Sequence, residues 1–175
     1  MIDGWVRLME YEESKIAAPE VAQTIYNILS NFFFDLETYW IIQEHYRAQE
    51  LSDPTRPIWI LLSNNCLQMA VVEWCKVFGS PQNNKTHYTK CIDPLEGIEN
   101  TVKEMKEFRD KYISHYDSYD KPVPFLYKAI EIVDMFDDCM LDKYETNNVI
   151  KTTDYMNRVY KDIQQRLLTI ISNKG

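Results

Sequence analysis

The segment from Phe108 to Asp117 gathers residue types that could carry out chemistry on a phosphate group. Arg109 stands next to Asp110, and His115, one of three histidines in the chain, follows six residues after the arginine. Arginine binds phosphate through a planar, permanently charged guanidinium, and histidine gives or takes a proton near neutral pH. Such a pair can support the cleavage of a phosphodiester without a metal ion.

The spacing of the two residues limits how they could act. On an ideal α-helix Arg109 and His115 are separated by about 9 Å along the axis and about 120° around it. Their side chains would have to converge on a phosphate between them, or on a second copy of the helix across a two-fold axis. We therefore expect a homodimer whose interface includes the end of the helix that carries the motif.

Proline and glycine stops predict the two helices that precede the motif. Pro19 suits the first turn of a helix, and apolar residues at spacings of three and four continue it through residues 21–42. This helix should end before the Asp53–Pro57 stretch, which contains two prolines. A second helix is predicted from about Pro57 to Phe78, where Gly79-Ser80-Pro81 stops it.

The motif belongs to a third predicted helix. Residues 80–92 are polar and predict a loop, after which Asp93-Pro94-Leu95-Glu96 offers an N-cap, a proline at the first helical position and a capping-box acid. The apolar positions that continue the helix into the motif are Ile98, Val102, Met105, Phe108 and Tyr112. We expect Phe108 and Tyr112 to pack inward, and Arg109 and Asp110 to leave the apolar face.

Further helices complete the predicted fold. A fourth is expected from Phe125 through Met140, a fifth from about Thr153 to Ile170, and residues 5–16 could add a short leading helix. Only 4 glycines occur in 175 residues, which argues against folds rich in strands and tight turns, and no glycine-rich phosphate loop is present. The sequence predicts an all-α, single-domain bundle of five to six helices over residues 1–175.

Charge and composition exclude several classes of protein. The net charge of −8 rules out a broad basic surface for duplex nucleic acid, although residues 101–128 hold six basic against five acidic side chains. No apolar run reaches the roughly 18 residues of a membrane span, and the N-terminus does not resemble a signal peptide. Without CxxC pairs, the 4 cysteines predict reduced thiols and a cytoplasmic protein.

Other candidate sites carry weaker signals. His87 and Cys91 lie four residues apart, but a zinc site needs three or four ligands, so we expect neither a metal nor a cofactor. His45 is interpreted as a solvated helix residue. Cys66, Cys75 and Cys139 fall within apolar helical patterns, which predicts core positions. The polar break at Ser63-Asn64-Asn65 marks either a polar pocket or the exposed side of its helix.

The motif resembles that of the HEPN domains, all-α bundles that often carry Arg, a polar residue, a short spacer and His. Arg109, Asp110, four intervening residues and His115 match this pattern. The resemblance is widest to the branch found in abortive-infection proteins, in which a helix with a Phe-Gly-Ser-like end, as at Phe78-Gly79-Ser80, precedes the motif helix. It covers roughly residues 20–170 in helix order, and its specific part spans about ten residues.

The resemblance implies a metal-independent endoribonuclease that acts as a dimer on RNA, as a toxin or antiviral effector that a cognate antitoxin protein could control. Arg109 would bind the scissile phosphate, His115 would transfer a proton with the ribose 2′-OH, and Asp110 would orient one of them. Some HEPN toxins carry a modified tyrosine two residues after the histidine. Here that position is Asp117, so this modification is not expected.

A second hypothesis belongs to a different class. Arg109 and Asp110 are also compatible with helix-surface charges, and His115 with a residue favoured by the dipole at a helix C-terminus. Many HEPN members have lost activity. The chain could then be a non-catalytic helical module that binds a partner protein or a nucleotide, with the motif serving the dimer interface.

Overall fold

The structure is a computed structural model that describes residues 20–48, 50–113 and 123–144, together with residues 161, 164, 165 and 169. Four α-helices and two short helical turns make up its continuous segments, and none of the described residues forms a strand. The all-α prediction is therefore confirmed. The predicted leading helix at residues 5–16 lies outside the described residues. Of the helix expected from Thr153, only Lys161, Gln164, Gln165 and Thr169 are described, and all four are helical.

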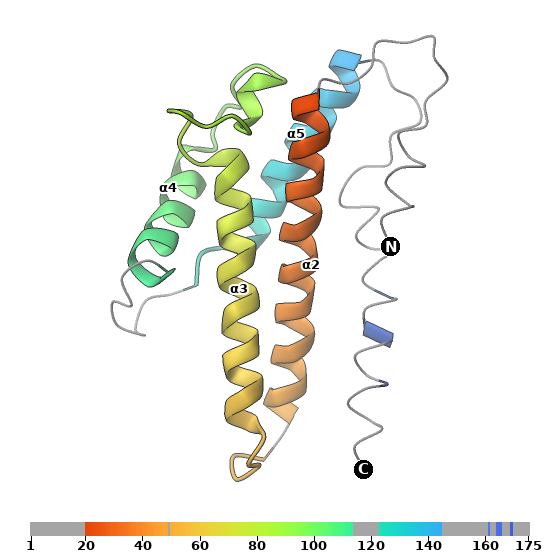
Figure 1. The fold of residues 1–175 in the computed structure, drawn as a ribbon, viewed down its shortest axis with the longest axis vertical. Helices are drawn as coiled ribbons and strands as arrows, with labels where there is room; N and C mark the ends of the chain where they lie inside the picture. Colours follow the sequence, from red (N-terminus) through yellow and green to blue (C-terminus); the bar gives the residue numbers. More distant parts are fainter. Residues whose placement is uncertain are drawn as a thin grey trace.

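The two longest helices form an antiparallel hairpin against which the other described helices pack (Figure 1). Helix α2 spans Glu20–Ala48 and α3 spans Arg56–Phe78, and each packs against the other along its length. Asp53 organises the connection, because its Oδ1 accepts hydrogen bonds from the backbone N–H of Thr55 at 2.8 Å and from the Thr55 hydroxyl at 2.7 Å. Both helices match the predicted ranges closely.

Gly79 ends α3 for a steric reason as well as a conformational one. Its N–H donates a hydrogen bond of 3.0 Å to the carbonyl of Cys75, which closes the last turn. A Cβ atom at this position would lie 2.3 Å from that same carbonyl oxygen. Any residue larger than glycine would therefore force the backbone to move at the end of the helix.

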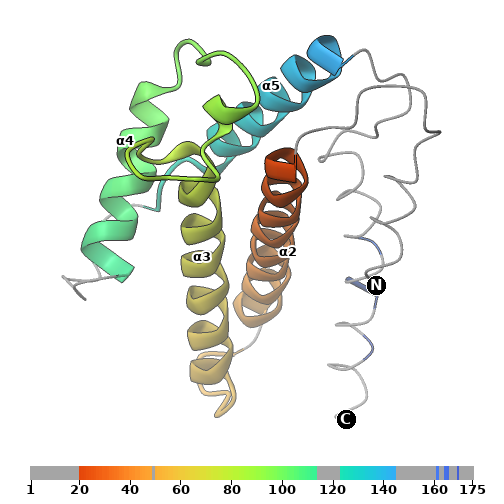
Figure 2. The ribbon, with the colours of Figure 1, turned by 45° about the horizontal axis from the view of Figure 1, so that its top comes forward.

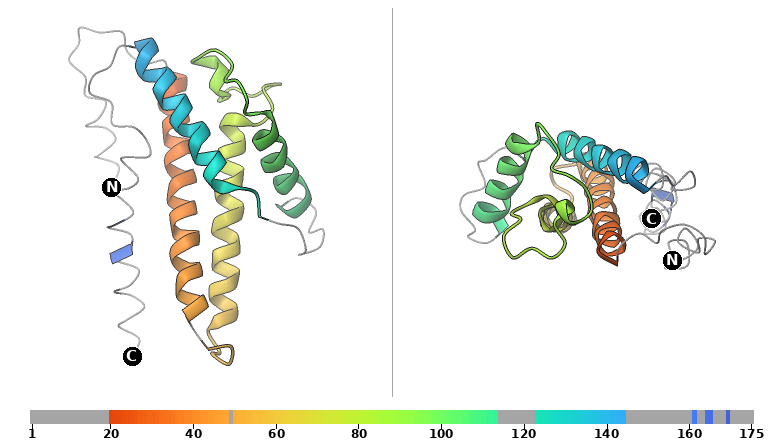
Figure 3. Two further views of the ribbon diagram at one scale, coloured as in Figure 1. Left: turned by 180° about the vertical axis from the view of Figure 1, so that it is seen from behind. Right: turned by 90° about the horizontal axis from the view of Figure 1, so that it is seen from above.

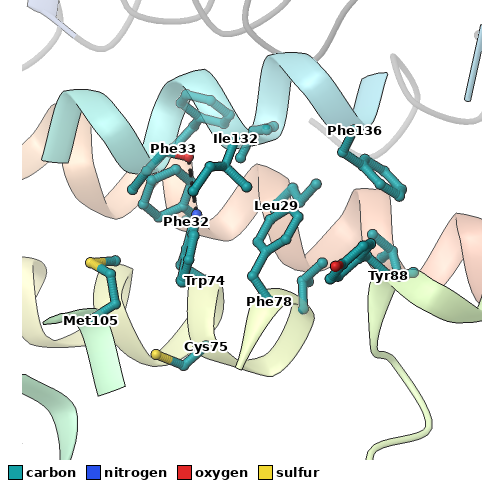
Figure 4. Close-up of a cluster of buried hydrophobic side chains, with 14 of the residues drawn as sticks. Leu29, Phe32, Phe33, Trp74, Cys75, Phe78, Tyr88, Met105, Ile132 and Phe136 are labelled. Atoms are coloured by element: carbon teal, nitrogen blue, oxygen red, sulfur yellow. Dashed lines mark hydrogen bonds between the residues drawn. The ribbon is translucent and has the colours of Figure 1, made fainter. Parts of the chain in front are cut away.

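Helix α5, Leu126–Tyr144, crosses the α2–α3 hairpin diagonally and covers its core (Figures 2 and 3). The indole Nε1 of Trp74 donates a hydrogen bond of 3.0 Å to the carbonyl of Ala129, so the buried end of α3 is tied to α5. Phe78 packs edge-on against Phe136, with their ring centroids 6.1 Å apart. The Tyr26 ring also packs on Phe136, with a centroid distance of 5.9 Å. Figure 4 shows Trp74, Phe78 and Phe136 among the buried side chains of the core.

The polar stretch after α3 is an irregular connection, as expected, but it contributes to the core. His87, Tyr88, Cys91 and Ile92 are buried, and a 3₁₀ turn spans Tyr88–Lys90. The Tyr88 ring packs on Phe78 with centroids 5.4 Å apart. The connection thus holds the end of α3 in place through aromatic packing.

The predicted start of the motif helix is wrong by five residues. Helix α4 spans Glu99–Phe108, with Ile98 at its N-cap, and Asp93 does not cap it. The intervening chain instead buries Leu95 and Ile98, and the N–H of Leu95 donates a 3.2 Å hydrogen bond to the Tyr88 hydroxyl. Gly97 adopts a φ of 75°, which interrupts any helix between Pro94 and Ile98. Burial of two apolar side chains therefore outweighs the local capping signal.

Among the described helices, none is both long and apolar enough to cross a membrane.

Candidate functional site

The motif begins where α4 changes its helical geometry. A π-helical turn spans Arg109–Ile113 directly after Phe108 and packs against α3. The N–H of Arg109 still donates to the carbonyls of Met105 and Lys106, so the change occurs within one continuous helix. Such turns are rare and often occur at functional sites. The ideal α-helical spacing assumed for this segment therefore does not hold from Arg109 onward.

Arg109 and Asp110 form a close ion pair within this turn. The Nε and Nη2 atoms of Arg109 lie 2.8 and 2.7 Å from the same Asp110 oxygen, Oδ1. The two side chains are 31% and 55% exposed, so both remain accessible to a ligand. Asp110 leaves the apolar face, as predicted, whereas Arg109 is half-buried.

The packing of the inner face of this helix is only partly as predicted. Ile98 and Met105 are buried, whereas Val102 and Phe108 are half-buried against the core. Phe108 therefore contributes less to the core than the sequence pattern suggested. The side chain of Tyr112 lies outside the described residues.

The electrostatics of Cys75 show where the motif sits on α3. Burial raises the pKa of the Cys75 thiol to about 11, and the nearby charge of Arg109 opposes this rise while Asp110 reinforces it. Cys75 is fully packed inside the core. The Arg109–Asp110 pair therefore lies over the C-terminal half of α3, close to the best-packed part of the molecule.

Two lysines extend the positive charge of Arg109 along α4. Neither Lys103 nor Lys106 has a carboxylate within ion-pair distance in the described part of the chain, whereas Lys111 pairs with Glu107 at 3.7 Å. Residues 99–111 nevertheless contain four acidic and four basic side chains. Two lysines without an ion-pair partner among the described residues therefore stand beside the paired Arg109 within a neutral segment, which favours local contacts over strong long-range attraction.

A groove with a volume of about 760 Å³ runs between α4 and the connection that follows α3, and Asp110 lies on its rim. Its apolar lining includes Phe78, Tyr88, Leu95 and Ile98. Charged residues on the α4 side are Glu99, Lys103, Lys106, Glu107 and Asp110. This arrangement offers an apolar floor for a flat or aliphatic group and a charged edge for a polar one.

His87 lines the same groove but is held in a structural role. It is 4% exposed, and its Nδ1 lies 2.8 Å from the Thr89 hydroxyl. Burial lowers the pKa of His87, and a hydrogen bond to the Gly79 carbonyl only partly offsets this effect. The lowered pKa favours the neutral imidazole, which fixes the connection through its contact with Thr89. The described residues contain no group of three or more side chains suited to a metal, so the weak His87–Cys91 signal gains no further ligand.

His115 lies outside the described residues, so its relation to Arg109 and Asp110 stays a prediction. The remaining histidine, His45, is half-buried and lies edge-on to Trp59 with ring centroids 4.9 Å apart. It is therefore less solvated than its polar sequence context suggested. All four cysteines are free thiols, and Cys66 and Cys139 sit at the edge of the core instead of inside it.

Two half-buried carboxyl groups on α2, Asp35 and Glu37, and one buried on α3, Glu73, were not anticipated from the sequence. Burial raises the pKa of Glu37 to about 7, and burial together with the charge of Glu73 raises that of Asp35 to about 6. Glu73 is 5% exposed and contacts Lys76 at 2.5 Å through Oε1. These acids follow or interrupt runs of apolar residues on α2 and α3. The spacing of the apolar residues along each helix therefore does not predict that the acids are buried.

Comparisons of the chain with protein-family models, with curated proteins and with solved structures found no match.

Proposed function

We propose that this chain is a metal-independent endoribonuclease of the HEPN type, with Arg109, Asp110 and His115 as its catalytic residues. The observation that carries the proposal is the partly exposed Arg109–Asp110 pair in a π-helical turn beside a groove. Structural surface ion pairs have no need of a rare helical geometry, whereas sites that bind ligands often use one.

Arg109 would bind the scissile phosphate of RNA. Its guanidinium carries five N–H donors, and Nε and Nη2 already contact Asp110, which leaves further donors for phosphate oxygens. The carboxylate would fix the plane of the guanidinium before substrate arrives. Such preorganisation reduces the ordering cost of binding, and a bidentate grip stabilises the extra negative charge of the transition state.

Lys103 and Lys106 would contact the RNA backbone on the same side of α4. Residues 103, 106 and 109 are three apart, so each step advances about 4.5 Å along the axis and about 60° around it, and the three cations spread over about 120° of the helix surface. No acidic partner competes for the two lysines in the described part of the chain. Phosphates adjacent to the scissile one would then be held next to Arg109.

His115 would transfer the proton in the cleavage step. The ribose 2′-OH loses its proton and attacks the adjacent phosphorus in line, the 5′-oxygen leaves with a proton, and a 2′,3′-cyclic phosphate remains. An imidazole with a pKa near neutrality suits either proton transfer. All atoms of the reaction come from RNA and the catalytic side chains, so no metal-bound water takes part.

The resemblance also supports a biological context. We propose that the enzyme acts in the cytoplasm as a homodimeric toxin or antiviral effector, and that a cognate antitoxin protein restrains it. The dimer would supply two copies of the motif.

The second candidate is a non-catalytic module that binds a partner protein or nucleotide. The apolar floor of the groove, with Phe78 and Tyr88 beneath a charged edge, favours this alternative because ligand sites combine apolar walls with few polar groups. Incubation of the purified chain with RNA in excess EDTA separates the two. The nuclease proposal predicts cleavage by the parent and none by an Arg109→Ala His115→Ala variant, and an inactive parent would favour the binding module.

A further inference from the structure

Helix α3 exposes an uncharged apolar stripe from Ile58 to Met69. Ile58, Leu61 and Met69 are 59%, 60% and 49% exposed, and Leu62 is 41% exposed. Their spacing places all four within about 100° of the helix circumference, on one side of α3. This part of the hairpin extends beyond α4 and α5, so neither described helix covers it (Figures 1 and 3).

The stripe also lacks any charge. The sixteen residues from Pro57 to Val72 contain no Asp, Glu, Lys, Arg or His, although the chain as a whole has a net charge of −8. A solvent-facing helix normally carries charged residues on its outer face. On a strongly acidic protein, an uncharged outer face lets two identical copies meet without like-charge repulsion.

The pattern of the stripe is symmetric about Asn65. Leu61 and Met69 lie four residues before and after it, and Ile58 and Val72 lie seven before and after it. Two α3 helices paired antiparallel about a two-fold axis at Asn65 would therefore place Leu61 against Met69 and Ile58 against Val72. The exposed Asn65 would meet its own copy at the axis, where paired amides can hydrogen-bond and fix the register.

We propose that α3 is the homodimer interface of this protein, with the two copies antiparallel about Asn65. This inference is independent of the catalytic proposal, since it rests on a surface that contains no motif residue. The apolar stripe is about 21 Å long, which is short for an interface of about 800 Å² per partner. We therefore expect a dimer with a dissociation constant of about 1 to 100 µM.

The pairing has a consequence for the motif. The π-helical turn of each copy packs against α3 near Cys75, and the antiparallel arrangement places the N-terminal half of the partner's α3 along this C-terminal region. The ends of both α4 helices would then border the interface. Because Cys75 lies ten residues from Asn65, each motif would stand about 15 Å from the two-fold axis along α3, so this dimer would border the two motifs without joining them.

Sedimentation equilibrium of the full chain tests the surface. A Leu61→Glu variant should weaken the dimer at least about tenfold, because it buries a charge opposite Met69. A Met135→Glu variant provides the matched control, since Met135 is 39% exposed on α5, away from the stripe. Circular dichroism would establish that both variants remain helical.

Disulfide formation tests the register. Asn65→Cys should cross-link two copies under mild oxidation, whereas Met69→Cys should not, because its two copies would lie about 12 Å apart along the axis. A chain that remains monomeric at about 100 µM would overturn the proposal and assign the stripe to a different protein. A dimer that Leu61→Glu leaves intact, or equal cross-linking of both cysteine variants, would also overturn it.

Discussion

Arg109 directs its guanidinium onto the carboxylate of its immediate neighbour, Asp110, and two of its nitrogens share a single oxygen at 2.8 and 2.7 Å. Adjacent side chains on a regular α-helix do not face each other. The contact depends on the length of the arginine side chain and on the wider turn from Arg109 to Ile113. It fixes the orientation of the one permanently charged group in the motif.

This orientation predicts that Arg109 is not replaceable by lysine. Arg109→Lys should reduce RNA cleavage nearly as much as Arg109→Ala, because an ammonium cannot reproduce the bidentate grip of a guanidinium on phosphate. Cleavage rates at saturating RNA, with thermal melting as a control for folding, measure the effect. A lysine variant with near-parental activity would mean that Arg109 supplies only general positive charge.

The chemistry of the reaction predicts its products. If the 2′-OH is the nucleophile, each cleavage should leave a 2′,3′-cyclic phosphate on one fragment and a 5′-OH on the other. Mass spectrometry of a short RNA after digestion in EDTA identifies both ends. Fragments that carry a 5′-phosphate would indicate attack by water and a different mechanism.

The two apolar residues that precede the motif should differ in their contribution to stability. Met105 is 0% exposed, so Met105→Ala should lower the free energy of unfolding by about 2 to 5 kcal/mol. Phe108 is half-buried, and Phe108→Ala should cost only about 1 to 2 kcal/mol. Urea denaturation measures both values. A larger loss at Phe108 would show that the face of α4 has been assigned incorrectly.

Glu37 should make stability depend on pH. Its pKa rises from 4.5 to about 7 in the folded protein because burial disfavours the charged form. The neutral carboxyl therefore favours the folded state below pH 4.5, and this contribution is lost as the pH rises through about 7.

Replacing Glu37 by Gln removes that titration. As the pH rises from 4.5 to 8, the free energy of unfolding of Glu37→Gln should increase by about 1 to 2 kcal/mol relative to that of the parent. Glu44→Gln, on the exposed side of α2, is the control. Urea denaturation at both pH values gives the difference. Parallel pH profiles for Glu37→Gln and the parent would contradict the assigned burial of this carboxyl group.

Helix positions were predictable wherever local chemistry decided them. Pro57 and Gly79 mark the ends of α3 because their effects on the backbone act within a few residues. Helix α5 begins at Leu126, one residue after the predicted start at Phe125. The start of α4 was not predictable in this way. There Leu95 and Ile98 are buried in the core, and this tertiary packing outweighs the capping residues.

The candidate site was predictable only in part. The types and spacing of Arg109 and Asp110 indicated an exposed polar pair, which the structure contains. The π-helical turn has no established sequence signal, and the groove arises only when α4 packs beside the connection after α3. Burial of Asp35 and Glu37 likewise depends on tertiary packing, because their helical positions alone would suit a surface.

The most direct test of the account is the single-turnover rate of RNA cleavage by the parent and by His115→Ala, both in excess EDTA. The account predicts metal-independent cleavage by the parent and a rate about 10² to 10⁴ times lower for the variant, which is the usual contribution of a positioned acid or base. Both proteins should have the same helical content and the same oligomeric state. Equal rates for the two proteins, or loss of the parent's activity in EDTA, would contradict the account.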